Sequence, residues 1–385
     1  MNFLPRSLGT RPRLACEVRA EGVVAARAED ALAVLSAVAR VPLAAEIVVP
    51  RLQGDDESAS TTGVGGDAAG RAAVVAALRK ALEAVSLRSR EVTLIVPDAA
   101  VRVLLLDFDE LPAKPVEALP VVRFRLKKLL PFDADNAAIS YQVMATAKGS
   151  LQVLAVAMPR QLLDDYESVV REAGFEPGAV LPSTLAALAG LPEQEAPLLV
   201  VNAGREGVTT AIVKAGVLLL HRTVDLGADL RADAAAAQLA ALADQIPPAA
   251  SETWQRQEPA SFNEQNDSAA AIEASSLAQE IVLEVAQEIV AERSLSETAI
   301  EVAQAVSVAA AYFEDTLQMP PSAIRAAGTL GAATLSALLA EARVGPLIVQ
   351  EMLQSSMLGA GATSAGSPGG VPLGWLAGVR GALAN

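Results

Sequence analysis

The chain contains little of what most metal and disulfide sites require. It has one cysteine, Cys16, and one histidine, His221, in 385 residues. A single cysteine excludes a disulfide framework and a metal cage built from cysteines, and a single histidine excludes a histidine-rich zinc or iron site. Cys16 is expected to be a small core hydrophobe. His221 is expected to be a surface or half-buried structural residue, since the only nearby acid in the sequence is Asp225.

Positive charge is also scarce, with 30 Lys and Arg against 45 Asp and Glu and a formal net charge of -15. Nucleic-acid binding needs a basic surface, so no nucleic-acid partner is expected. No uncharged apolar run reaches the roughly 18 residues that a membrane-spanning helix needs. The N-terminal residues lack the apolar region of a signal peptide, and we therefore expect a cytoplasmic protein.

Aromatic residues make up only 3% of the chain, whereas 52% of it is hydrophobic. The core must therefore be built from Ala, Val and Leu, and the length is sufficient for two domains. The motifs of several enzyme classes are missing as well. The sequence has no Ser-His-Asp order, no Walker phosphate loop and no GxGxxG.

The most informative segment that is present covers residues 198–227, LLVVNAGREGVTTAIVKAGVLLLHRTVDLG. Its Val, Ile, Leu and Thr content and its two turns predict a meander of three strands. Gly204 and Gly207 let the backbone approach an anion, and Thr209 and Thr210 supply hydroxyl donors. A nucleotide hydrolase of this kind would need an acid at the first turn, where the chain has the amide Asn202.

Periodicity and turn residues predict the other elements. We expect a hairpin at Leu14–Val18 with Gly22–Ala26, and a helix or an edge strand at Ala31–Ala39. A loop or disordered segment at Asp55–Gly70 then precedes a helix at Arg71–Ser86. An α+β region follows, with strands at Val92–Val96, Val101–Asp107, Ile139–Thr146 and Leu151–Pro159 and helices at Val116–Leu130 and Gln161–Ala173. After the meander, the pattern predicts a strand at Ile324–Ala326 and helices at Thr298–Leu317, Ala332–Ala342 and Leu373–Leu383.

Two charged segments have two interpretations each. Residues 246–276 lack periodicity and are predicted to be disordered. The predicted helix that follows, Leu277–Ala291, has an acidic stripe. This stripe is either a solvated face or a docking face for a basic partner. The predicted helix Val116–Leu130 contains the only dense basic cluster, which is either a solvated face or a face attracted to anionic lipid. Its cations are Arg123, Arg125, Lys127 and Lys128.

Several of these passages together resemble a known family. They are the KKLLPFD step followed by a strand with YQV, the run LQVLAVAMPRQLLDDYESVVREAGFEPGAV, the NAG…TT…HRTVDLG meander, and later VAQAVSVAAAYFEDTL and IRAAGTLGA. They resemble the PilM family of type IV pilus assembly proteins, relatives of the actin-like ATPases with the layout of the cell-division protein FtsA. The resemblance runs from about Val92 to Gly227 and resumes near the C-terminus.

The resemblance implies a two-domain α/β fold of the actin-like (ribonuclease H-like) type with a small inserted α+β subdomain. On this basis the expected divisions are the first part of domain 1 at 1–91, the inserted βαββαβ-like subdomain at 92–180 and a return helix of domain 1 at 181–197. Domain 2 is expected at 198–345, with its acidic insertion at 246–276, and a C-terminal segment of domain 1 at 346–385.

The resemblance also implies where a nucleotide would bind. The first phosphate hairpin has Glu17 near the acid position and Arg19 where the family has glycine. Binding of ATP with Mg²⁺ is possible on this basis, whereas hydrolysis is not expected, and no catalytic residue or metal ligand is assigned. The candidate nucleotide-binding residues are Asn202, Gly204, Thr209, Thr210, Gly328 and Gly331.

The function that the resemblance implies is scaffolding beneath the inner membrane, on its cytoplasmic face, as part of the type IV pilus platform with its motor proteins. The expected partner is the cytoplasmic tail of a PilN-like protein, in a groove near Phe124, Leu129, Phe132 and Tyr141. One alternative is an ATP-binding conformational switch of the same machine. Another is the cytoplasmic domain of a GspL-like type II secretion platform protein, a family that continues into a transmembrane helix, whereas this chain ends at Asn385.

Overall fold

The computed structural model describes residues 12–29, 34–44, 47, 52, 63–147, 149–192, 195–205, 207–226, 299–345, 347–359 and 371–384. The chain divides into one unit formed by Met1–Asp225 with Val302–Asn385 and a second unit formed by Leu226–Glu301. The first unit contains every helix and strand named below. The predicted disorder at 246–276 and the predicted helix Leu277–Ala291 lie outside the described residues.

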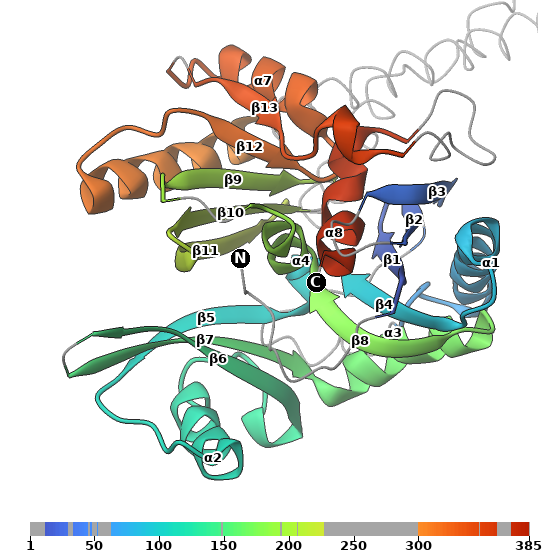
Figure 1. Cartoon of the computed structure of the whole chain (residues 1–385), viewed down its shortest axis with the longest axis horizontal. Coiled ribbons are helices and arrows are strands. Elements are labelled where there is room, and N and C mark those ends of the chain that lie inside the picture. Colours follow the sequence, from blue (N-terminus) through green and yellow to red (C-terminus); the bar gives the residue numbers. More distant parts are fainter. Residues whose placement is uncertain are drawn as a thin grey trace, which may run out of the picture. The chain divides into compact units, whose positions relative to one another are not determined.

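A five-stranded sheet opens the fold, with the order β3-β2-β1-β4-β8. The first three strands form an antiparallel meander, and the last two join it in parallel. Figure 1 shows them in blue, cyan and green beside the helix α1. Their bounds are β1 Leu14–Arg19, β2 Gly22–Ala28, β3 Leu35–Pro42, β4 Glu91–Val96 and β8 Glu176–Pro182.

A second five-stranded sheet repeats this plan, with the order β11-β10-β9-β12-β13. Again a three-stranded antiparallel meander is extended by two parallel strands. The strands are β9 Leu198–Ala203, β10 Gly207–Lys214, β11 Val217–Asp225, β12 Ile324–Ala327 and β13 Val349–Glu351. The chain therefore contains the same α/β topology twice, in agreement with the predicted two-domain arrangement.

Helices cover both faces of the first sheet. Asp67 caps the N-terminus of α1 (Ala68–Val85) by accepting a hydrogen bond from Gly70 N at 2.7 Å. Along β1, alternate side chains face opposite sides: Cys16 belongs to the core beneath α1, and Ala15 belongs to the core beneath α8 (Leu373–Leu383). Cys16 is fully buried, as predicted, and this burial raises the pKa of its thiol.

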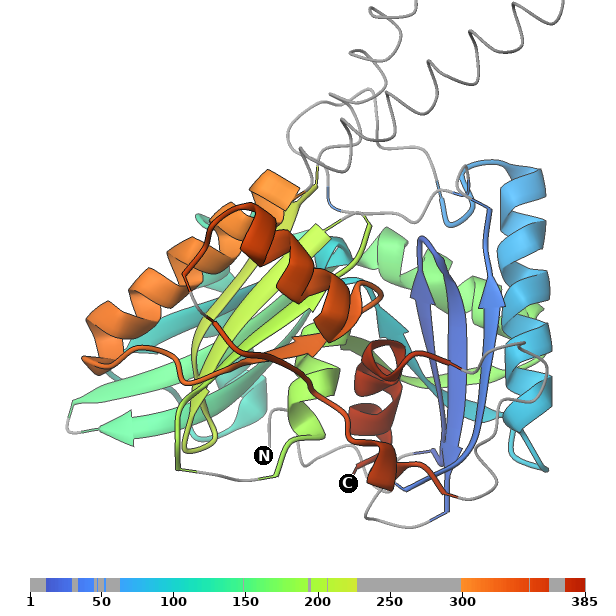
Figure 2. The ribbon, with the colours of Figure 1, turned by 90° about the horizontal axis from the view of Figure 1, so that it is seen from above.

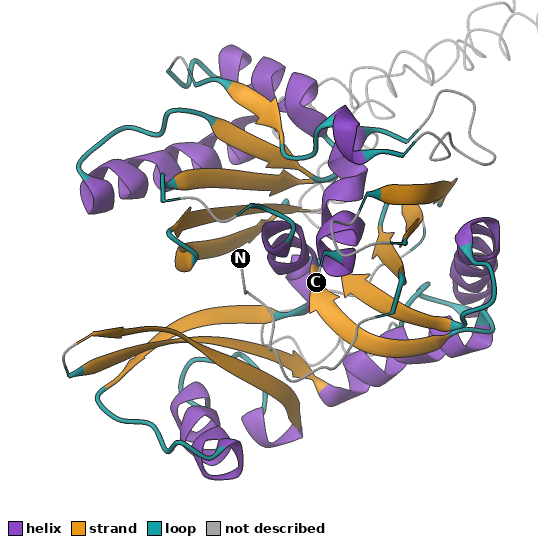
Figure 3. Cartoon of the chain, viewed as in Figure 1, coloured by secondary structure: helices purple, strands orange, loops and turns teal. Residues whose placement is uncertain are grey.

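A three-stranded antiparallel sheet, β5-β7-β6, forms the inserted subdomain. Its strands are β5 Arg102–Phe108, β6 Ala137–Ala147 and β7 Ser150–Pro159, and α2 (Pro115–Leu126) covers one face. Figure 3 shows the purple helix α2 against these orange strands. The shared core consists of Leu106, Val122, Leu126, Val153, Ala155 and Ala157.

The remaining described elements connect these sheets. They are the 3-10 turns η2 Asp98–Ala100, η3 Ala134–Asn136 and η4 Ser355–Met357, and the helices α3 Arg160–Glu172, α4 Ser183–Ala189 and α7 Gly331–Glu341. Residues 302–317 are also helical. Figure 2 shows, from above, that α8 lies between the two five-stranded sheets. Its residues contact α4, β1, β2 and β12, so it packs against both sheets.

Strand pairing corrects several predicted boundaries. The predicted inserted subdomain 92–180 is too wide, because β4 and β8 pair with each other in the first sheet. The predicted return helix 181–197 is wrong at its start, where Leu181 and Pro182 still belong to β8. The segment 346–385 was assigned to domain 1, yet β13 pairs with β12 in the second sheet. The loop predicted at Asp55–Gly70 ends earlier, because α1 already begins at Ala68.

Candidate functional site

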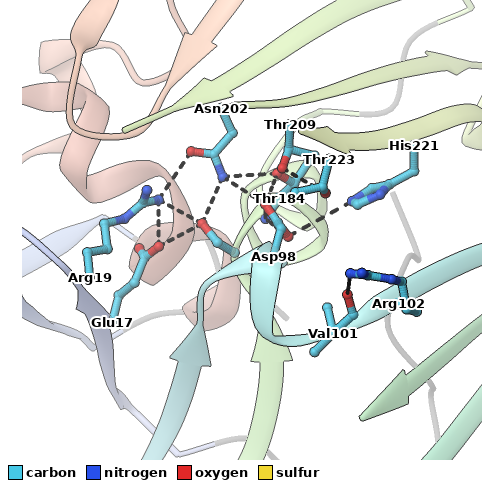
Figure 4. Close-up of polar contacts among 11 residues, drawn as sticks. Glu17, Arg19, Asp98, Val101, Arg102, Thr184, Asn202, Thr209, His221 and Thr223 are labelled. Carbon is cyan, nitrogen blue, oxygen red and sulfur yellow. Dashed lines mark hydrogen bonds and ion pairs between the residues drawn. The ribbon is translucent and has the colours of Figure 1, made fainter. Parts of the chain in front are cut away.

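A buried polar cluster lies where strands of the two sheets end and face each other (Figure 4). Glu17 comes from β1, and Asn202 comes from β9. On β1, Glu17 lies on the same face as the buried Ala15, and on β9, Asn202 lies on the same face as the buried Val200. The cluster is therefore the polar end of an otherwise apolar contact between the sheets and α8.

The guanidinium of Arg19 occupies the middle of this cluster. Its Nη2 lies 2.6 Å from Oε1 of Glu17 and donates hydrogen bonds to Oγ of Ser183 at 2.7 Å and Oδ1 of Asn202 at 3.2 Å. The Glu17 side chain is 0% exposed and the Arg19 side chain 11% exposed. Burial is the main cause that raises the pKa of Glu17, and the charge of Arg19 acts in the opposite direction.

Asp98 forms a second centre, at the start of η2 directly after β4. Its carboxylate accepts from Thr184 N at 3.0 Å, Thr184 Oγ1 at 2.5 Å and Asn202 Nδ2 at 3.3 Å. Nε2 of His221 lies 3.9 Å from Oδ1 of Asp98. His221 as a whole is half-buried, as predicted, although its side chain is only 3% exposed. That burial lowers the pKa of the imidazole, and the charge of Asp98 opposes the shift.

Glu21, in the turn between β1 and β2, reaches across to the second sheet. Its Oε1 accepts hydrogen bonds from the backbone N–H of Arg205 and from the hydroxyl of Thr329, each at 2.5 Å. The guanidinium of Arg205 donates back to the carbonyl oxygen of Ala20 at 3.0 Å. Three turns, those after β1, β9 and β12, are thus joined through one carboxylate.

A small cavity adjoins these groups. Its volume is about 60 Å³, and it is lined by Arg19, Glu21, Asp98, Ser183, Asn202, Gly204, Arg205, Thr209 and Thr223, among others. Pockets that hold nucleotide-sized ligands have volumes of roughly 300–1,000 Å³. In this conformation the residues therefore do not fit a magnesium nucleotide, because Arg19 and Glu21 take up the space between the turns.

The structure separates the predicted nucleotide-binding residues into three groups. Asn202, Gly204 and Thr209 line the cavity, and Thr209 Oγ1 lies 3.0 Å from Thr223 Oγ1. The neighbouring Thr210 points to the opposite face of β10, where its buried hydroxyl has no hydrogen-bond partner among the described residues. The other two candidates are in the turn after β12.

Gly328 and Gly331 have positive φ values of 92° and 69° and shape that turn. A Cβ on Gly328 would come within 2.6 Å of Oδ1 of Asn202, so glycine is needed for this close approach. Gly331 begins α7, where Oε1 of Glu351 accepts from Ala332 N at 2.8 Å. Neither glycine is among the residues that line the cavity.

The four predicted partner-binding residues differ in exposure. Phe124 and Leu129 are exposed on the outer side of α2 and in the turn after it. Phe132 and Tyr141 are partly buried and pack against the core beneath α2. The basic cluster is also divided. Arg123 donates to the carbonyl oxygens of Ala134 and Ala137, and Lys127 pairs with Asp135 at 2.6 Å.

Sequence reasoning missed Asp98, Thr184, Ser183 and Glu21. Two sequence signals were available, the PDA step after a buried strand and the Pro-Ser-Thr step that ends β8 and opens α4. Polar residues at the ends of strands gather at one sheet edge. Within the described residues, no group of three or more His, Cys, Asp or Glu side chains could hold a metal ion. Likewise, no helix in the described ranges is sufficiently long and apolar to cross a membrane.

Comparison with known proteins bears on the fold. No family model matches the sequence, and no curated protein matches it. Among solved structures, the PilM–PilN type IV pilus biogenesis complex contains a chain that is 17% identical, with a TM-score of 0.59 over 97% of this chain and 98% of that chain. The fold is that of the actin-like ATPases.

Two further similarities have lower scores. The ethanolamine utilization protein EutJ from Carboxydothermus hydrogenoformans is 13% identical, with a TM-score of 0.39 over 100% of this chain and 91% of that chain. The cytoplasmic domain of EpsL, from the type II secretion system of Vibrio cholerae, is 14% identical, with a TM-score of 0.34 over 65% of this chain and 79% of that chain.

Proposed function

We propose that this protein is a scaffold of a type IV pilus assembly platform that binds the cytoplasmic tail of a PilN-like protein at the inner membrane. The observation that carries the proposal is the full-length likeness to PilM, whose structure comes from a complex with PilN. The filled space between the turns supports scaffolding rather than ATP hydrolysis. A hydrolase must admit a nucleotide there, and the space is taken by Arg19 and Glu21.

The outer side of the inserted subdomain supports a peptide partner. Phe124 is 70% exposed and Leu129 49% exposed, and Val116 and Val121 on the same helix are also exposed. Apolar side chains gathered on one helix in this way are typical of interaction surfaces. We therefore place the tail on this face of α2, with Phe124 as its main anchor, because aromatic side chains dominate binding energies at such surfaces.

The test is a titration of a labelled peptide that has the sequence of the cytoplasmic tail of a PilN-like protein, followed by fluorescence anisotropy. We expect saturable binding by the wild type and roughly tenfold weaker binding by Phe124→Ser. Leu87→Ser is the matched control, because Leu87 is 75% exposed and lies outside the inserted subdomain. The proposal fails if the wild type shows no saturation, and the place of the anchor is wrong if both variants bind equally well.

The same titration with Mg-ATP present distinguishes a scaffold from a nucleotide-dependent switch. A scaffold binds the tail with the same affinity whether or not Mg-ATP is present. A change in affinity of tenfold or more corresponds to a coupling free energy of about 1.4 kcal/mol, and this result would favour the switch.

A further inference from the structure

The turn between β9 and β10 has the features of an anion-binding site. Its backbone N–H at Arg205, together with the hydroxyl of Thr329 from the next turn, points at one position. A Cβ on Gly204 would lie 3.0 Å from the Thr329 hydroxyl and 3.0 Å from the group at that position. The glycine therefore makes room for an anion in contact with the backbone.

The anion at this position is the chain's own Glu21 carboxylate. Its Oε1 accepts both hydrogen bonds at 2.5 Å, although Glu21 is separated from Thr329 by 308 positions in the sequence. Hydrogen bonds to a charged acceptor are shorter and stronger than neutral ones. The site is thus satisfied within the chain, by a side chain from the opposite sheet.

A cation position beside it is satisfied in the same way. A carboxylate oxygen of Glu17, the hydroxyl of Ser183 and the amide oxygen of Asn202 all lie within 3.2 Å of Nη2 of Arg19. These are oxygen ligands of the kind that hard cations choose. Here the cation that these oxygens bind is the guanidinium of Arg19.

The turn that starts α7 repeats the pattern with a different carboxylate. Glu351 accepts from Ala332 N at 2.8 Å, in the first turn of the helix. The free N–H groups and the dipole at a helix start favour a negative charge there. A side chain of the chain itself therefore occupies each of the three turns at which the family resemblance implies a nucleotide.

We propose that Glu21 is a built-in ligand that masks an anion-binding site at Gly204 and Arg205, and that with Arg19 it holds the two sheets together in one arrangement without nucleotide. An added phosphate would have to displace the Glu21 carboxylate, in a cavity that Asp98 also lines. This inference does not depend on which partner binds α2.

The test removes the mask and uses inorganic phosphate as the probe. Wild type, Glu21→Ala and the control Glu29→Ala are compared by thermal unfolding and calorimetric titration with phosphate, against sodium chloride at equal ionic strength. Glu29 lies just after β2, is exposed and pairs only with Arg27 among the contacts of the described residues.

Glu21→Ala is expected to melt at a lower temperature than wild type and to regain stability as phosphate is added. Without the Glu21 carboxylate, its hydrogen-bond donors are free to bind phosphate. The phosphate affinity of Glu21→Ala should therefore exceed that of wild type roughly ten- to a hundredfold, which is the energy of one charge-assisted hydrogen bond. Wild type and Glu29→Ala are expected to show no response to phosphate or to Mg-ATP. Stoichiometric binding of either ligand by wild type would overturn the proposal, as would a folded Glu21→Ala that gains no phosphate affinity.

Glu21→Gln decides the question if the alanine variant does not fold. The amide keeps an acceptor oxygen in the turn, so this variant is expected to fold. Because a neutral amide competes less well than a carboxylate, phosphate should raise its melting temperature too, by less than in Glu21→Ala. The absence of any phosphate effect in a folded Glu21→Gln variant would also refute the masking.

Discussion

Removing Arg19 tests whether the buried ion pair holds the two sheets together. Arg19→Met keeps much of the apolar length of the side chain and deletes the guanidinium that lies 2.6 Å from Oε1 of Glu17. The Glu17 carboxylate is 0% exposed and its other oxygen, Oε2, has no hydrogen-bond partner among the described residues. Leaving such a charge buried without its partner costs about 3–5 kcal/mol of the free energy of unfolding at neutral pH.

The second variant of the cycle is Glu17→Gln. If the loss in Arg19→Met comes from an uncompensated charge, the double variant should recover about half of it or more, because no charge is then left without a partner. The pH dependence gives a further check. Burial already raises the pKa of Glu17 and Arg19 holds it down, so the pKa rises further in Arg19→Met. The deficit is therefore largest above that raised pKa and shrinks as the pH falls and the carboxyl becomes protonated.

Urea unfolding followed by circular dichroism measures these free energies. Lys114→Met is the control, because Lys114 and Glu117 form a pair at 3.2 Å in which both side chains are largely exposed. Exposed pairs contribute about 0–1 kcal/mol, so this control should unfold like the wild type. The reasoning is wrong if Arg19→Met costs less than about 1 kcal/mol, or if Glu17→Gln does not restore stability to it.

Two further predictions concern the same region. Burial lowers the pKa of His221 in the native chain. Below about pH 6.5 the unfolded chain therefore takes up a proton that the native chain does not. As the pH is lowered, the free energy of unfolding decreases by at most about 1.4 kcal/mol per pH unit. His221 is the only histidine, so His221→Gln should remove that slope from urea unfolding at pH 5.5–7.5, and an unchanged slope would contradict the assignment. A Cβ on Gly378 would lie 2.5 Å from Oε2 of Glu17, so Gly378→Ala should destabilise by about 1–3 kcal/mol. The measurement is thermal unfolding, and the control is Gly345→Ala, because a Cβ at Gly345 meets nothing within 4 Å. Equal melting temperatures for the two variants would refute the predicted crowding at Gly378.

Local patterns predicted most of the individual elements. The meander at 198–227 and the helix Leu373–Leu383 appear almost as expected, because strand alternation, turn glycines and helical spacing reflect contacts between near neighbours. The predicted helix Val116–Leu130 was too long, since α2 ends at Leu126 and a turn follows. There Leu129 N and Leu130 N both donate to the carbonyl oxygen of Leu126.

The sequence did not predict to which sheet a strand belongs. β4 was predicted as a strand, whereas β8 was not, and the apolar side chains of such strands do not indicate which neighbour they will pair with. Only the pairing of β4 with β1 and of β13 with β12 assigned them. The same limit explains the candidate site. Asn202 and Gly204 stood out within a turn, whereas Asp98 looked like an ordinary residue in a short loop.

The sequence by itself determined the fold class and placed Arg19 and Asn202 at two turns. The tertiary structure alone decided what those two side chains contact. Arg19 meets Asn202 across 183 positions, and Glu21 meets Thr329 across 308. Such distant side chains meet only because two similar sheets pack around α8 and bring their turns together. The pattern of neighbouring residues reflects local hydrogen bonds and burial, and it contains no information on which distant turn will supply the opposite charge.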